Sequence, residues 1–244
     1  MMRRLWGALG ILLVLATPLF PSVGSCAPGD GLAGTAHDFS GLGTPETGLC
    51  SFCLTPHRAQ TQRLLWNHKL SSNTFTWAAV ETESGTPYPT IQGDTYTGPT
   101  AKCLSCHDGS VAVGELVWWN GGSPSVPLLN LKITGAAQVA TATGNLQNNH
   151  PVAMPYPYNN NPSTYNTVSN GPGLALNDWV ADPTTLGIRL YHDNGAGNIG
   201  SGPVVGQTGI ECSSCHDPHN GPNVEDILLL LGTIGGICDK CHIK

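Results

Sequence analysis

The sequence predicts a mostly irregular, loop-rich fold with only a few short helices and strands. Its composition points this way, because 31 glycines and 19 prolines among 244 residues approach the share found in loop-rich chains. Charged residues make up only 11% of the chain and hydrophobic residues 40%. We therefore expect something other than helices and sheets to supply the buried apolar area, as metals and disulfides do in small scaffolds.

Four Cys-x-x-Cys pairs are the third and most specific observation. In the second, third and fourth pairs a histidine follows at once: Cys103-Leu-Ser-Cys106-His107, Cys212-Ser-Ser-Cys215-His216 and Cys238-Asp-Lys-Cys241-His242. This pentapeptide is the attachment signal for c-type haem, in which both thiols bind the porphyrin and the histidine lies beneath the iron. The expected fold class is therefore a multihaem cytochrome c in which haems form the core.

The first pair, Cys50-Ser-Phe-Cys53, departs from this signal because Leu54 follows it. In an alignment with the third pair, Leu54 stands where that pair has its histidine, whereas His57 matches His219. Three readings stay open. Haem is attached through Cys50 and Cys53 with another histidine on the iron, which we favour; the iron is five-coordinate; or cytochrome maturation skips the site. Four haems c are expected in total, three of them from complete motifs.

Histidine is the expected second ligand on each iron. Met154 is the only methionine beyond the first two residues, and the chain carries nine histidines beside only 10 lysines and arginines. This surplus indicates that imidazole is wanted as a ligand. The histidines that follow the pairs are the expected proximal ligands: His107, His216 and His242. The expected distal set is His37, His57, His68, His150 and His219, and His192 is left out.

The N-terminal residues 1–27 read as a secretory signal peptide, with a charged start, an apolar run and a small-residue exit. Residues 28–244 then form the multihaem domain. Cys26 lies in a short lipobox-like sequence, Val-Gly-Ser-Cys, and is either lipidated or lost with the leader. Membrane attachment is expected only if Cys26 is lipidated.

Regular structure is expected in few places. Residues 58–70 are the best helix candidate, residues 110–119 alternate loosely like a strand, and residues 120–209 form a spacer or a small β-rich lobe. The net charge of -6 argues against nucleic acid as a partner.

With these residues the chain resembles the OmcE-type tetrahaem c-type cytochromes, the extracellular cytochrome filament family. The likeness runs through most of the chain in order: His37-Asp-Phe-Ser, Cys-x-Phe-Cys-x-Thr-Pro-His57, Trp-Asn-His68, Cys-Leu-Ser-Cys-His-Asp-Gly109, His150-Pro-Val and Cys-x-x-Cys-His-Asp-Pro-His219. It implies four covalent haems, histidine on both faces of the irons, and electron transport without substrate turnover. Leu54 departs from the family, which has histidine there.

The expected function is electron transfer through closely spaced bis-histidine haems in an exported protein that is not an enzyme. Expected partners are redox proteins or extracellular electron acceptors, together with further copies of the chain in a conductive filament at the cell surface or outside the cell. A periplasmic soluble carrier is one alternative, and a multihaem reductase with an open haem site near Cys50 and Cys53 is another. Zinc binding is less favoured because a histidine directly follows three pairs. A disulfide framework is less favoured because a bridge within Cys-x-x-Cys closes a tiny loop.

Overall fold

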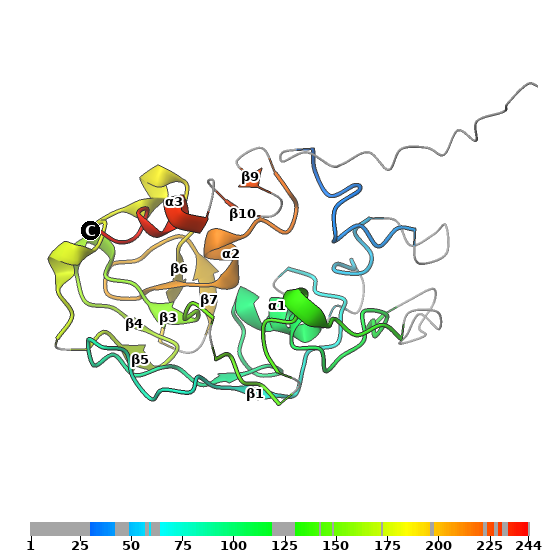
Figure 1. The fold of residues 1–244 in the computed structure, drawn as a ribbon, viewed down its shortest axis with the longest axis horizontal. Helices are drawn as coiled ribbons and strands as arrows, with labels where there is room; N and C mark the ends of the chain where they lie inside the picture. The colour runs from blue at the N-terminus through cyan, green and yellow to red at the C-terminus, as the bar shows by residue number, and fades with distance from the viewer. Residues whose placement is uncertain are drawn as a thin grey trace, which may run out of the picture.

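A computed structural model of the chain (Figure 1) describes residues 30–41, 49–56, 59, 64–118, 130–141, 143–147, 149–171, 173–195, 198–221, 224–226, 229–230 and 234–243. Within these residues the regular elements are short. They follow one another as β1 (Thr74–Phe75), β2 (Ile91–Gln92), α1 (Pro99–His107), η1 (Gly135–Ala137), β3 (Met154–Pro155), η2 (Tyr158–Asn160), β4 (Thr164–Tyr165), β5 (Val168–Ser169), η3 (Leu176–Asp178), η4 (Pro183–Leu186), β6 (Tyr191–Asp193), β7 (Ile199–Ser201), β8 (Thr208–Ile210), α2 (Cys212–Cys215), β9 (Val224–Asp226), β10 (Leu229–Leu230) and α3 (Ile234–Cys238). The η elements are single 3-10 turns.

The largest sheet is antiparallel, with the strand order β3-β8-β6-β7. Three two-stranded sheets accompany it in the described residues: β1-β2, β4-β5 and β9-β10. Gly209 of β8, in the large sheet, must lack a side chain because a Cβ atom there would collide with the ring of Tyr165. The ring can therefore lie against β8 and reach the start of α2. Of the two readings for residues 120–209, the β-rich lobe is confirmed.

The helices are each short, and their ends have identifiable causes. Gly98 and Pro99 start α1, and proline suits a first helical position because its missing N–H would have no partner there. A capping box starts α2: the Glu211 side chain accepts from the N–H of Ser214, and the Ser214 side chain accepts from the N–H of Glu211. Figure 1 shows α3, α2 and α1 one after another across the molecule.

Protein side chains form the core. The main cluster joins the β1-β2 hairpin, α1 and the large sheet, and consists of Phe75, Ile91, Tyr96, Ala101, Leu104, Ala140, Leu146, Ala153, Tyr165 and Ile199. A second cluster contains Phe52, Val113 and Leu116, and a third contains Tyr156, Ile188 and Leu190. Fully burying a side chain such as Leu104 stabilises the fold by about 1.5–3 kcal/mol.

The predicted fold class, an irregular polypeptide with haems as its core, was wrong. The described residues contain ten strands in four sheets, and they pack apolar side chains against one another. Nor does the described part of the chain contain a group of three or more His, Cys, Asp or Glu side chains that could hold a metal ion. Glycine and proline are abundant because strands of two or three residues need many tight turns between them.

Two smaller predictions also differ from the structure. The described part of the expected helix, residues 64–70, is not helical, because Leu64 and Leu65 have positive φ angles of 64° and 49°. This segment instead pairs with the first Cys-x-x-Cys region, where Trp66 forms an antiparallel bridge with Leu54. Of the expected strand, the described residues 110–118 contain only bends, a turn and one bridge, at Leu116.

Membrane-spanning helices were sought among the described residues only. No helix there combines the length and the apolar character that crossing a bilayer requires. The expected signal peptide, residues 1–27, and Cys26 lie outside the described residues.

Candidate functional site

The second and third Cys-x-x-Cys pairs are in direct contact. They lie on α1 and α2, which pack against each other. The thiol of Cys103 hydrogen bonds to the sulfur of Cys212. This bond, together with burial, raises the pKa of Cys103, and the same bond lowers the pKa of Cys212. The fold thus brings together two pairs that are more than a hundred residues apart in the sequence.

The first and fourth pairs continue this contact in both directions. Burial raises the pKa of Cys106 to about 12, and the nearby charge of Cys53 in the first pair adds to the shift. Burial also raises the pKa of Cys241 to about 12, with a further contribution from Cys215 in the third pair. The four pairs therefore form a row in which each is the neighbour of the next, in the order of the sequence.

The histidine of the second pair faces a histidine from the N-terminal arm. The rings of His107 and His37 have centroids 5.9 Å apart and an interplanar angle of 64°. His107 Nδ1 lies 2.7 Å from the carbonyl oxygen of Ala137, and His37 Nδ1 lies 3.4 Å from that of Pro218. An Nδ1–H donated to a carbonyl leaves Nε2 unprotonated and orients it for a metal.

Burial is the main cause that lowers the pKa of His37, and the nearby His107 contributes to the lowering. A lowered pKa keeps this imidazole neutral, which is the form that binds metals. The fold therefore places the expected proximal ligand His107 next to the expected distal ligand His37.

The histidine of the fourth pair has a similar partner. His242 and His150 have ring centroids 6.5 Å apart at 60°. His150 Nδ1 lies 2.9 Å from the carbonyl oxygen of Pro151. Trp179 packs on His242 with a centroid distance of 4.4 Å, and the two residues form an antiparallel bridge. Sequence reasoning missed Trp179, because its position becomes evident only when residues 179–180 pair with residues 241–243.

Both histidine pairs have the spacing of an imidazole–metal–imidazole axis. A metal–imidazole bond is about 2 Å long, so two such bonds in line place the ring centroids roughly 6 Å apart. The observed separations are 5.9 Å and 6.5 Å. None of the eight described cysteines is in a disulfide, so each described pair keeps both of its thiols. This donor set fits covalently attached haem with histidine on both faces.

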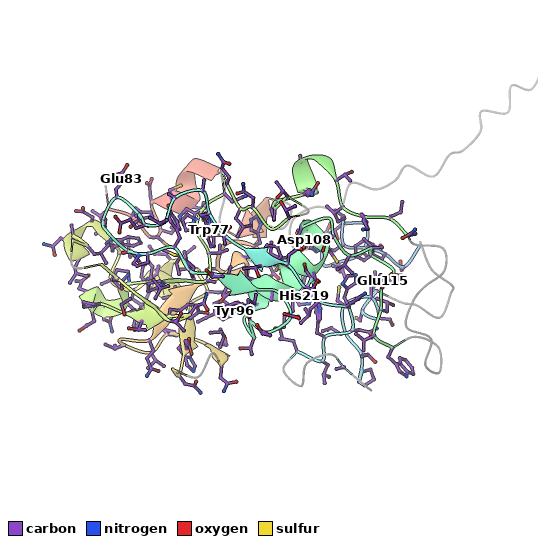
Figure 2. The ribbon with its side chains drawn as sticks, turned by 90° about the horizontal axis from the view of Figure 1, so that it is seen from below. Trp77, Glu83, Tyr96, Asp108, Glu115 and His219 are labelled. Atoms are coloured by element: carbon purple, nitrogen blue, oxygen red, sulfur yellow. The ribbon has the colours of Figure 1, made fainter. Side chains whose placement is uncertain are left out.

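The third pair ends at His216, directly after α2. The chain then turns at Asp217, whose carboxylate accepts from Arg189 Nη2 at 2.9 Å and from the N–H of His219 at 3.1 Å. The His219 side chain is 72% exposed and its Nδ1 lies 3.7 Å from Asp217 (His219 is labelled in Figure 2). The expected distal ligand His219 thus lies at the surface of the chain.

The first pair lies in turns and not on a helix. Cys50 is exposed, and both Cys53 and Leu54 donate their N–H groups to the carbonyl of Cys50. Burial raises the pKa of Cys53 to about 11. The residue that the sequence aligns with His219, His57, lies outside the described residues.

His68 lies between the first and second pairs. It is 2% exposed, and its Nε2 atom is 3.5 Å from the sulfur of Cys106. The bridge between Trp66 and Leu54 brings the segment to the first pair, and a second bridge, between His68 and Leu116, fixes its other side. The predicted ligand His68 is therefore buried near two cysteine pairs, and both of its ring nitrogens face carbonyl oxygens. Nδ1 lies 2.8 Å from the oxygen of Lys69, and Nε2 lies 2.9 Å from that of Ala112.

Glu211 is the functional-site residue that sequence reasoning missed entirely. It directly precedes the third pair and is 1% exposed, and its carboxylate is surrounded by hydroxyl groups from α1, β4 and the loop before α1. The spacing of Glu211 and Ser214 is a capping-box signal. That signal predicts a helix start but not the contacts with α1.

The sequence was also compared with protein-family models and with curated proteins, and neither comparison found a match.

Proposed function

We propose that the protein is a multihaem c-type cytochrome that transfers electrons along the row of Cys-x-x-Cys pairs. The observation that carries this proposal is the coincidence of two independent patterns. Cysteines of neighbouring pairs shift each other's pKa values along the whole row, and two of the histidines that follow the pairs each face a second histidine at 5.9 Å or 6.5 Å. Zinc sites and disulfide frameworks also bring cysteines together, but they do not require the second pattern, in which two histidines face each other.

Each group in the row has a definite part in this proposal. The cysteines of the four pairs would attach the haems, and His107 with His37, and His242 with His150, would hold the second and fourth irons. Ala137, Pro218 and Pro151 orient three of these imidazoles through Nδ1. Bound haem supplies an iron that accepts and releases one electron. Two imidazoles per iron, without a thioether sulfur ligand, favour a low reduction potential.

His68 is the proposed ligand for the first iron, in place of the histidine that Leu54 replaces. Its support is its buried position near the first pair, reached through the bridge between Trp66 and Leu54. To bind the iron, one ring nitrogen would have to leave its carbonyl partner, Lys69 or Ala112. Haem is then attached through Cys50 and Cys53 with an altered ligand. The five-coordinate reading corresponds to the reductase alternative, in which an open iron position binds a small anion.

The resemblance to the OmcE-type family also suggests where the protein acts and what it assembles with. We propose that the chain is exported, acts at the cell surface or outside the cell, and passes electrons to redox proteins or extracellular acceptors. Further copies of the chain would assemble with it in a heterologous head-to-tail contact that does not close, as any filament requires. The exposed ring of His219 is compatible with a contact to a second copy.

The test is expression in a host that performs cytochrome maturation, followed by intact mass and visible spectroscopy. The proposal predicts a Soret band, a mass increase of four haems, and low-spin signals from the second and fourth irons that added cyanide or nitrite leaves unchanged. A colourless product with an unmodified mass would contradict it. A high-spin signal that responds to nitrite would favour the reductase alternative.

A further inference from the structure

A buried carboxylate joins the helices of the second and third pairs. Glu211 Oε1 accepts hydrogen bonds from the hydroxyls of Tyr96 and Tyr165, both at 2.5 Å. Its Oε2 accepts from the backbone N–H of Thr100 at 3.0 Å and also from the Thr100 hydroxyl. Tyr96, labelled in Figure 2, lies just before α1, Thr100 lies in its first turn, and Tyr165 lies on β4. One side chain thus connects three elements.

The backbone continues this connection to the third pair. The N–H of Cys212 donates to the Thr100 hydroxyl at 3.2 Å, and the N–H of Glu211 donates to the Ser214 hydroxyl at 2.9 Å. Thr100 and Cys103 are one turn apart on α1. Because Thr100 contacts Glu211 and Cys212 together, it holds the parts of α1 and α2 that carry Cys103 and Cys212 beside each other.

Space for the carboxylate depends on a glycine. A Cβ atom at Gly98 would lie 2.7 Å from Glu211 Oε1 and would collide with the ring of Tyr96. The absence of a side chain at Gly98 therefore allows the start of α1 to approach Glu211. This close approach is a second indication that the fold is built around the carboxylate.

Burial raises the pKa of the Glu211 carboxyl, whereas the hydrogen bonds that it accepts from Thr100, Tyr165 and Tyr96 act to lower that pKa and favour the ionised form. An ionised carboxylate only accepts, at about four lone-pair positions, and the three hydroxyls and one N–H from Tyr96, Tyr165 and Thr100 fill a comparable number. Lys102 is buried on the same helix, but it donates to the carbonyl oxygens of Thr97 and Gly98, at 2.6 Å and 3.2 Å. In a low-dielectric interior a fixed negative charge acts over a longer range than in water.

We propose that Glu211 is a positioning residue that fixes the second and third haems relative to each other and lowers their reduction potentials through its negative charge. This inference rests on the proposed function. A negative charge beside an iron stabilises the ferric form, so that reduction requires a more negative potential. The residue acts through Cys103, Cys212 and the two helices and touches no ligand histidine in the described contacts.

The test compares the wild-type holoprotein with E211Q, E211A and a control, D193N. Asp193 is also a buried carboxylate, on β6, and it accepts from the N–H groups of Asn166 and Gly195. Each variant is examined by intact mass, by excitonic splitting of the Soret band in circular dichroism, and by a spectroelectrochemical titration.

E211Q keeps the length and planar shape of the side chain but not its charge. We expect four haems, wild-type excitonic splitting, and a shift of part of the titration to more positive potential. E211A is expected to show the same potential shift together with a loss of excitonic splitting, which E211Q restores. D193N is expected to leave both signals as in the wild type. A purely structural role would lower the melting temperature without moving the potential of E211Q.

The inference is overturned if haem is present and E211Q titrates like the wild type, and the proposed function then stands. Should E211A not be recovered as folded protein, the potential of E211Q alone decides. A wild-type protein without covalent haem would overturn the proposed function and this inference together.

Discussion

The first and second Cys-x-x-Cys regions present the same spacing on different local structures. The second pair lies on the nine-residue helix α1, and its histidine, His107, faces His37. The first pair lies in turns and is followed by Leu54, and among the described residues its neighbouring imidazole is that of His68, from a separate segment. Two cysteines can therefore be presented by a turn as well as by a helix, but the adjacent ligand must then come from elsewhere.

The residue after the ligand position also differs between these regions. Asp108, which follows the second pair's histidine, is fully buried and accepts from the hydroxyl of Ser71 at 2.5 Å, the amide of Asn73 at 2.9 Å and the N–H of Ser110 at 2.8 Å. The first region has Thr55 at this place. The second region is thus held to its surroundings by a carboxylate, which the first region lacks.

Of the changes considered, removing the second pair should have the largest effect on electron transfer. We expect the double variant C103A/C106A to lose one haem by intact mass and to slow electron transfer between the remaining haems, because a member is missing from the middle of the row. The matched control C50A/C53A should lose one haem from the end of the row and leave the transfer rate among the others nearly unchanged. Equal rates in the two double variants would contradict the order of the row.

Removing the arm histidine tests the ligand pair of the second region alone. We expect His37→Ala to leave the haem count unchanged and to convert one iron from low spin to high spin, because the ring facing His107 is lost. Electron paramagnetic resonance of the oxidised protein measures this change. His192→Ala is the control, since His192 bonds the carbonyl of Gly202 through Nδ1 and faces no second histidine in the described ring contacts. A fully low-spin His37→Ala spectrum would show that His37 is not a ligand.

Restoring the missing histidine should make the first region resemble the second. We expect Leu54→His to raise the fraction of molecules that carry a haem on the first pair. In the Leu54→His background, His68→Ala should then no longer change the spin state of the first iron. In the wild-type background, His68→Ala should produce a high-spin iron. The measurements are intact mass and electron paramagnetic resonance for the single and double variants. If L54H leaves the effect of His68→Ala unchanged, His68 does not serve the first iron.

Asp108 should contribute to stability where Thr55 does not. We expect Asp108→Asn to lower the free energy of unfolding by about 1.5–3 kcal/mol, because hydrogen bonds to a charged group are lost. Thr55→Ala is the comparison, although Thr55 is also buried. Denaturant titrations followed by circular dichroism measure both. A smaller loss for Asp108→Asn than for Thr55→Ala would show that the carboxylate is not what distinguishes the second region.

In the third region Asp217 stands where the second region has Asp108. Its replacement should have the smallest effect on stability. Burial acts to raise the pKa of this carboxyl, but hydrogen bonds from Arg189 and from the N–H groups of His219 and Gly221 outweigh it, so the pKa lies below its ordinary value of 3.8. A lowered pKa stabilises the fold above pH 3.8, and this contribution is lost as the pH falls through the folded-state value. We expect Asp217→Asn to lower stability by about 1 kcal/mol at pH 7. The two proteins should converge in acid, and a difference that persists at pH 2 would contradict this origin.

The sequence alone identified residues that the structure brings together, but it did not predict the fold. The cysteine pairs and most ligand candidates follow from local spacing, and the structure brings His37 to His107 and His150 to His242. Strands of two or three residues leave no readable alternation, so the sheets could not be predicted from the pattern. Glu211 was missed because Tyr96 and Tyr165 are 115 and 46 residues away from it.

The helix expected over residues 58–70 shows a different limit. Its composition suits a helix, but Leu64 and Leu65 adopt positive φ angles that a helix does not allow. Pairing with the first cysteine region decides the conformation there, and the backbone of Asn67 donates to the carbonyl of Cys53 at 2.8 Å. Tertiary contacts of this kind override local preference and cannot be inferred from one short segment.

The central claim is that electrons move along thioether-bound haems held by four neighbouring cysteine pairs. The most direct measurement is the intact mass of the protein after maturation, with peptide mapping to place each haem. We predict four haem masses, located on the peptides that contain Cys50 and Cys53, Cys103 and Cys106, Cys212 and Cys215, and Cys238 and Cys241. Alkylation of these cysteines as free thiols in the denatured protein would contradict the account.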